Sequence, residues 1–128
     1  MTYEAFEQAV TDMLADIPDE FLQGLQGVHV LEHAKPEPFE GVFRLGEYLD
    51  PGPDAFLGTN VGLGRHIALY YGSFVEIAQG QPAFDWETEL WETITHELRH
   101  HVESRAGDVS LIEDDLERER RFKHSRDM

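Results

Sequence analysis

Apolar residues recur every three to four positions through residues 86–106, a spacing typical of an amphipathic helix. The segment contains neither Gly nor Pro, and Asp85 is a suitable N-cap before it. Gly107 is a natural C-terminal cap after it. At about 100° per residue, one side of this helix gathers Glu87, Leu90, Trp91, Ile94, Leu98 and Val102. The pattern predicts a helix that packs along that stripe and ends at Gly107.

Shorter patterns predict the other elements. Residues 3–16 form an amphipathic helix capped by Thr2, and Pro18 separates it from a short helical segment at 19–25. Strands are expected at 28–33, 41–48 and 66–71, with a short helix at 73–79. Residues 35–38 read as a proline-stiffened connection and residues 50–64 as a glycine-rich rim loop. A last helix is expected from a capping box at 110–113 and should fray by about residue 122.

This order of elements predicts an α+β fold in which a small mixed sheet packs against the helix at 86–106, with further helices on its flanks. A chain of 128 residues is long enough to bury one core. We therefore expect a single domain over residues 1–122 and a disordered tail over residues 123–128.

Charge and composition narrow the class of function. A formal charge of -16 argues against nucleic acid as a partner, since phosphate binding requires a basic surface. No apolar run reaches the length that spans a membrane, and the N-terminus lacks a signal-like pattern, so we expect no membrane partner and a cytoplasmic protein. Because the chain has no cysteine, any metal must be held by histidines and carboxylates.

The chemistry that the chain offers is concentrated in His-Glu-Leu-Arg-His at residues 96–100. On a helix, His96 and His100 lie one turn apart and project from the same face, where two imidazoles can hold one zinc ion. Glu97 between them could act as general base on an activated water molecule. Short matches of this kind also arise by chance, and a histidine pair on a helix can be a plain surface feature.

Three other histidines are candidates for ligands. His101 follows the motif but falls back into the apolar stripe by helical phase, so it is interpreted as a core histidine or one that supports the ligands. His29 and His33 lie on an expected strand without an acidic partner nearby in the sequence. They are interpreted as surface residues rather than ligands.

A catalytic zinc site needs a third protein ligand. Asp114 is the first choice, because the chain can turn at Gly107 and return to the level of His100 within a few extended residues. The alternatives are Glu113, Asp115, Asp108 and Glu103. A simpler interpretation of residues 113–115 is the acidic first turn of a helix, which the helix dipole favours.

The residues from Phe43 to Tyr48, the strand that starts at His66 and the motif at 95–101 resemble the small bacterial zincin-like metallopeptidases, which have a minimal zincin fold. The resemblance extends to about residue 116. It implies that His96 and His100 bind one zinc ion and that Glu97 is the general base. Members of that family continue with a Gly turn and an Asp ligand, whereas this chain has Glu103 and Ala106 before Gly107.

These observations predict a zinc-dependent metallopeptidase that acts on a peptide or protein substrate. An extended substrate could add as a further strand beside residues 66–71. The alternative is a zincin-fold module that is weakly active or inactive and serves in metal or protein binding. A pure metal buffer or sensor is a third interpretation, but it leaves Glu97 without a role.

Overall fold

The computed structural model describes residues 1–50 and 64–109, the last three by their backbone alone. Its elements confirm the α+β prediction. In chain order they are α1 (Tyr3–Ala15), α2 (Asp19–Leu22), β1 (Leu25–Leu31), β2 (Lys35–Pro36), β3 (Phe43–Arg44), β4 (Gly46–Leu49), β5 (Arg65–Tyr70), α3 (Tyr71–Gln79) and α4 (Trp86–Val109). None of these helices is long and apolar enough to cross a membrane.

The main sheet has three strands in the order β1-β5-β4. β1 runs parallel to β5 and β4 runs antiparallel to it, so the sheet is mixed. β2 and β3 form a separate antiparallel hairpin. The suggestion that a substrate adds beside residues 66–71 is therefore wrong, because β5 already has a strand on each side. Continuous burial from Ile67 to Tyr70 is what a central strand shows.

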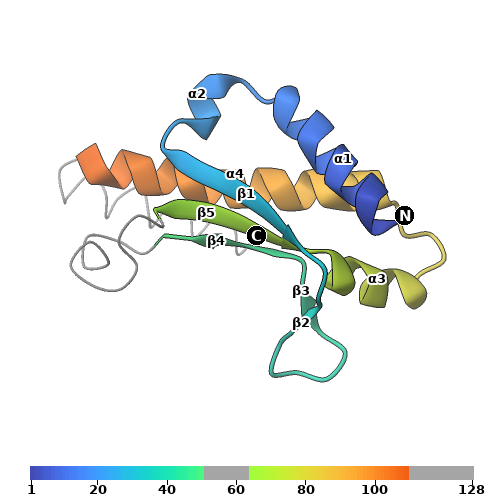
Figure 1. Cartoon of the computed structure of the whole chain (residues 1–128). Helices are drawn as coiled ribbons and strands as arrows, with labels where there is room; N and C mark the ends of the chain where they lie inside the picture. The colour runs from blue at the N-terminus through green and yellow to red at the C-terminus, as the bar shows by residue number, and fades with distance from the viewer. Residues whose placement is uncertain (51–63, 110–128) are drawn as a thin grey trace.

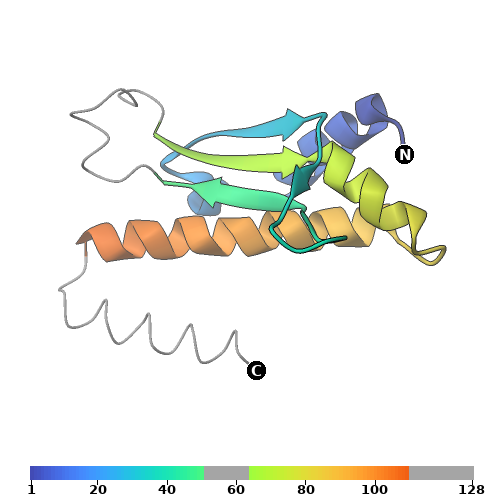
Figure 2. The ribbon, with the colours of Figure 1, turned by 90° about the horizontal axis from the view of Figure 1, so that it is seen from below.

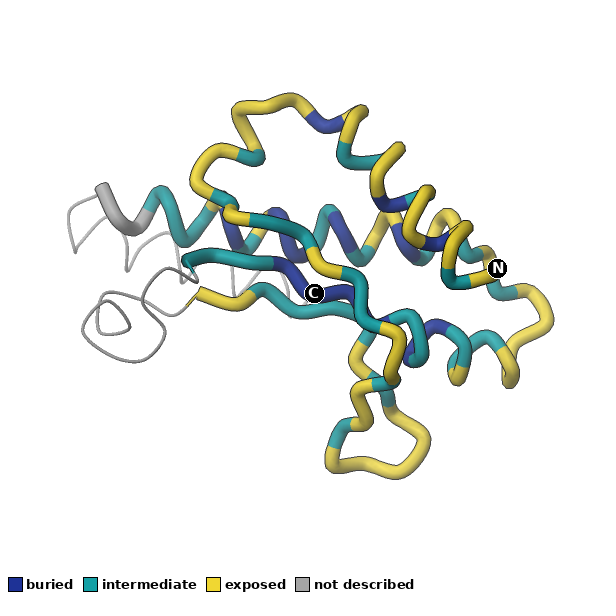
Figure 3. Tube along the Cα trace, viewed as in Figure 1, coloured by how far each residue is buried: buried dark blue, intermediate teal, exposed yellow. Residues whose placement is uncertain are grey.

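The helices and the sheet enclose one core. Figures 1 and 2 show α4 running along the length of the sheet, with β4 as the strand nearest to it. In the same views α1 lies on the β1 side, α3 continues from the end of β5, and the β2–β3 hairpin projects away from the body. Figure 3 shows buried positions on the surfaces where α1, β5 and α4 face one another. The buried cluster comprises Phe6, Val10, Ile17, Ile67, Leu69, Phe74, Leu90, Ile94 and Leu98.

The helix starts follow the capping residues that the sequence predicts. The Thr2 hydroxyl accepts a hydrogen bond from the Ala5 amide at 3.1 Å. The Asp85 carboxylate accepts one from the Thr88 amide at 3.2 Å. Both caps satisfy amides that the first turn of a helix leaves without a partner.

The predicted end of the long helix is wrong, because α4 continues through Gly107 to Val109. A single glycine costs a helix interior only about 1 kcal/mol relative to alanine, so it does not by itself end the helix. The chain reversal expected directly after residue 107 therefore does not occur there. The loop at 51–63, the last helix and the C-terminal tail lie outside the described residues.

The buried face of α4 is also rotated from the predicted stripe. Trp91 and Val102, two members of that stripe, are 41% and 39% exposed, whereas Glu97, which lies outside it, is buried. Periodicity places the apolar residues on one side of the helix but does not reveal that β4 covers the neighbouring side. The buried face consequently extends from Leu90 and Ile94 toward Glu97 and His101.

Candidate metal centre

The two motif histidines project together from the middle of α4, as their spacing predicts. The Nε2 atoms of His96 and His100 are 3.2 Å apart, and the two rings stand nearly perpendicular at 85°. Both side chains are half-buried. The helix backbone alone produces this proximity, because residues four apart lie one above the other.

The separation of the two nitrogens suits a tetrahedral metal ion. Zinc–nitrogen bonds of about 2.0–2.1 Å at a tetrahedral angle place two nitrogen ligands about 3.3 Å apart. Neutral imidazoles are ligands that divalent transition metals prefer. His96 and His100 therefore fit a metal ion by both donor type and spacing.

Glu97 completes a compact group of possible metal-binding side chains. One ligand atom from each of His96, Glu97 and His100 lies within 4.8 Å of the others. Glu97 is only 8% exposed, unlike the half-buried histidines on either side of it. By helical phase it stands between the face that carries the histidines and the face that joins the core. Its carboxylate is thus beside the histidine pair and largely shielded from bulk solvent.

The third ligand stays a prediction. Among residues 1–50 and 64–109, the group formed by His96, Glu97 and His100 does not include Glu103, one of the candidates. The backbone of Asp108 belongs to α4. Asp114, Glu113 and Asp115 lie outside the described residues.

His101 is fully buried and both of its ring nitrogens are engaged, which confirms the inward orientation predicted for it. Its Nε2 lies 2.7 Å from the Gln23 carbonyl oxygen and its Nδ1 lies 3.0 Å from the Tyr48 hydroxyl. Because a carbonyl can only accept, Nε2 carries the proton and donates it, and Nδ1 accepts from Tyr48. Burial lowers the pKa of His101, which is consistent with this neutral ring.

β4 lies close to α4 at Gly46. A Cβ atom at this position would lie 2.8 Å from Thr93 Cγ2, a distance that side chains essentially never adopt. Glycine is therefore needed where the strand and the helix touch. Thr93, Glu97 and His101 are spaced at four-residue intervals and form one row along α4, so the strand lies over the row that contains Glu97.

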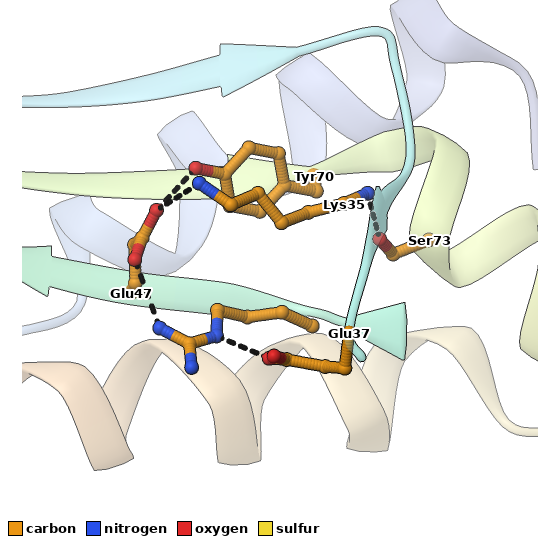
Figure 4. A network of polar contacts seen from close by, with 6 residues as sticks. Lys35, Glu37, Glu47, Tyr70 and Ser73 are labelled. Atoms are coloured by element: carbon orange, nitrogen blue, oxygen red, sulfur yellow. Dashed lines mark hydrogen bonds and ion pairs between the residues drawn. The ribbon is translucent and has the colours of Figure 1, made fainter. Parts of the chain in front are cut away.

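The opposite face of β4 is held by a network of charged and polar groups (Figure 4). Glu47 accepts hydrogen bonds from Tyr70 at 2.5 Å, from Arg44 at 2.9 Å and from Lys35 at 3.2 Å. Partial burial raises the pKa of Glu47, but these three donors outweigh it and hold the pKa below its ordinary value. The network ties β4 to β5 and to the β2–β3 hairpin.

Residues 25–120 match the family model described as zincin-like metallopeptidase. The chain belongs to the zincin-like metallopeptidase family. A solved structure of a conserved hypothetical protein from Thermus thermophilus is 61% identical, with a TM-score of 0.76, over 84% of this chain and 99% of that one. A search of curated proteins found no match.

This zincin-like chain has a second histidine pair on the outer face of the sheet. His29 Nε2 and His66 Nδ1 lie 2.8 Å apart, on the neighbouring strands β1 and β5. His66 Nε2 is buried and has no hydrogen-bond partner among the residues that the structure describes. His29 is exposed, and the His33 ring lies against Tyr70 with centroids 5.4 Å apart and a tilt of 59°. Neither belongs to the group formed by His96, Glu97 and His100.

The sequence does not reveal two of these features. The sequence marks Tyr48 only as part of a strand, and its hydrogen bond to His101 depends on how β4 packs against α4. The His29–His66 pair depends on strand register, because Gly27 pairs with His66 and leaves space for the His29 ring. A glycine two residues before a strand histidine was the only available signal, and it is weak without the partner strand.

Proposed function

We propose that this chain is a zinc-dependent metallopeptidase in which His96 and His100 bind the ion and Glu97 is the general base. The observation that carries the proposal is the 3.2 Å separation of the two Nε2 atoms with the Glu97 carboxylate in the same group. Membership of the zincin-like metallopeptidase family supports it. The expected partner is a peptide or a protein, not a nucleic acid.

A zinc ion, when bound, lowers the pKa of water to about 7 and polarises a carbonyl group. Glu97 takes a proton from the attacking water as the water oxygen bonds to the peptide carbonyl carbon. It then gives that proton to the amide nitrogen as the C–N bond breaks. The low exposure of Glu97 keeps bulk water from competing for its carboxylate.

We expect an extended substrate to add at β4. Within residues 1–50 and 64–109, β4 pairs with β5 along one edge and with no strand along the other. Figure 2 shows this edge on the side of the sheet that faces α4. A peptide that adds here as a further strand runs over the part of α4 that carries His96, Glu97 and His100.

The second candidate function is a zincin-fold module that binds metal or protein without hydrolysis. The continuation of α4 through Gly107 favours it, because the chain does not reverse where the Asp114 prediction required. Such a module has no use for a general base. Substitution of Glu97 therefore separates the two candidates.

The test compares zinc-loaded wild type, Glu97→Gln and Glu92→Gln on fluorescent casein. Glu92 is an exposed carboxylate on the same helix and provides the matched control. We expect Glu97→Gln to retain zinc but to lose about 10²–10⁴-fold in kcat/KM. Glu92→Gln should behave as wild type. Equal activity of Glu97→Gln and wild type would reject the mechanism, and zinc-loaded wild type without activity would favour the binding module.

A further inference from the structure

β4 is held over α4 by alternate residues. Gly46 lies beside Thr93, where a Cβ atom would come within 2.8 Å of Thr93 Cγ2, and Tyr48 donates a hydrogen bond to His101 at 3.0 Å. Thr93 and His101 are the two ends of the row whose middle member is Glu97. The two contacts therefore lie on either side of the proposed general base.

The Tyr48–His101 contact reaches a third segment. His101 Nε2 donates to the Gln23 carbonyl at 2.7 Å, in the connection between α2 and β1. The same connection packs on α4 at Gly24, where a Cβ would lie 3.1 Å from the Arg105 side chain. His101 thus joins α4 to both outer strands of the sheet, directly to β4 and through Gln23 to the start of β1.

A further contact supports the same arrangement at the end of β4. The Asp50 carboxylate accepts a hydrogen bond from the Ser104 hydroxyl of α4 and one from Arg65 of β5 at 3.4 Å. Gly46, Tyr48 and Asp50 are alternate positions along the chain, so all three face the helix. With Glu47 fixed on the other face of the strand, β4 has little freedom to move relative to α4.

His101 cannot itself bind metal or substrate. It is fully buried, and both ring nitrogens already have partners. The Tyr48 hydroxyl is directed to this buried ring. The hydrogen bond between the two residues joins β4 to α4, so its loss would change how β4 is held over Glu97.

We propose that Tyr48 and His101 are positioning residues, which hold the outer edge of β4, the edge away from β5, at a fixed place over Glu97 and so align an extended peptide with the His96–His100 pair. The inference rests on the proposed function, because it assumes that peptides add to β4. If Tyr48 and His101 only stabilised the fold, they would not affect how a peptide lies over the His96–His100 pair.

The test measures binding instead of hydrolysis. Zinc-loaded wild type, Tyr48→Phe and Tyr3→Phe are titrated with a peptide hydroxamate and with acetohydroxamic acid, which carries the same zinc-binding group without the peptide. Tyr3→Phe is the matched control, because it removes a hydroxyl that donates to the Val30 carbonyl of β1 at 3.2 Å. Zinc affinity is measured in parallel by competition with a chromophoric chelator.

We expect Tyr48→Phe to bind the peptide hydroxamate about fivefold more weakly, the change expected for the loss of one hydrogen bond. Acetohydroxamic acid and zinc should bind as in wild type, and Tyr3→Phe should change none of these affinities. Hydrogen exchange at the β4 amides should be about fivefold faster in Tyr48→Phe alone.

Two results would overturn the proposal. One is that the ratio of the two hydroxamate affinities is the same in Tyr48→Phe as in wild type. The other is that wild type binds the peptide hydroxamate no more tightly than acetohydroxamic acid. The proposed function fails separately, through absence of hydrolysis by zinc-loaded wild type. If the peptide advantage exists without hydrolysis and Tyr48→Phe reduces it, positioning by Tyr48 and His101 stands and the peptidase activity falls.

Discussion

The molecule contains two close pairs of imidazoles in different settings. His96 and His100 lie one turn apart on α4, with nitrogens 3.2 Å apart and the Glu97 carboxylate beside them. His29 and His66 lie on neighbouring strands with nitrogens 2.8 Å apart, and the remaining nitrogen of His66 is buried, with no partner in the described part of the chain. Only the helical pair belongs to a metal-binding group of three among the described residues.

The contrast shows that proximity of two histidines is not sufficient for a metal site. If His66 bound a metal through Nδ1, its proton would move to Nε2, where a buried N–H would have no acceptor. The neutral pair avoids this cost when His66 Nδ1 donates to His29 Nε2. The sheet pair is therefore best satisfied by its own hydrogen bond, whereas the helical pair is suited to an ion.

The largest expected effect is on zinc binding, which should depend on the His96–His100 pair and not on the His29–His66 pair. His96→Ala and His100→Ala should each abolish zinc binding, because either change leaves a single imidazole at the site. His29→Ala and His66→Ala should retain the affinity of wild type. Competition with a chromophoric chelator measures all four variants. Loss of zinc binding in His29→Ala or His66→Ala would show that the pair on the sheet also binds zinc.

The next largest effect is expected at the predicted third ligand, Asp114. On the basis of the sequence, Asp114→Ala should weaken zinc binding by more than about tenfold, since even residues that only support a ligand cost about 10–100-fold. Asp108→Ala should leave the affinity nearly unchanged. The same chelator competition decides, and equal affinities in wild type and Asp114→Ala would remove Asp114 from the site.

Burial should govern stability independently of zinc. His101→Ala should lower the free energy of unfolding by about 3 kcal/mol, because it leaves a cavity and two polar groups without partners. His29→Ala, at an exposed position, should cost less than about 1 kcal/mol. Urea denaturation of the zinc-free proteins gives both values. If His101→Ala instead lost zinc while remaining stable, the helical phase assigned to residue 101 would be wrong.

The smallest effect concerns pH. Burial and the neighbouring His29 ring lower the pKa of His66 below its ordinary value. The unfolded chain, with a histidine pKa of about 6.5, then binds more protons than the folded chain, so the free energy of unfolding should fall as the pH drops below about 6.5. His66→Gln should reduce this dependence and His33→Gln, at an exposed position, should not. Urea midpoints at several pH values test it, and an identical slope in His66→Gln would contradict the assignment.

The sequence predicted the features that depend on neighbouring residues better than the features that depend on packing between elements. The helix starts at Thr2 and Asp85 and the pairing of His96 with His100 depend on residues within one or two turns, so pattern and spacing suffice. The end of α4 did not follow from Gly107, because one glycine is a small cost against a long helix. Local capping chemistry thus shows where a helix can start more reliably than one glycine shows where it stops.

Strand order and contacts between elements could not be obtained in this way. Nothing local distinguishes a central β5 from an edge strand except its continuous apolar run, and the placement of β4 over Glu97 requires the whole sheet. The exposure of Trp91 and the burial of Glu97 follow from the same contact. Residues near the site that act through packing, such as Tyr48, are consequently the ones that sequence alone does not reveal.

The central claim is that the helical histidine pair holds zinc beside Glu97. Anomalous diffraction at the zinc edge from crystals of the zinc-loaded protein tests it most directly. We expect one strong peak between His96 Nε2 and His100 Nε2 and none between His29 and His66. A peak at the sheet pair, or no peak on α4 at saturating zinc, would contradict it.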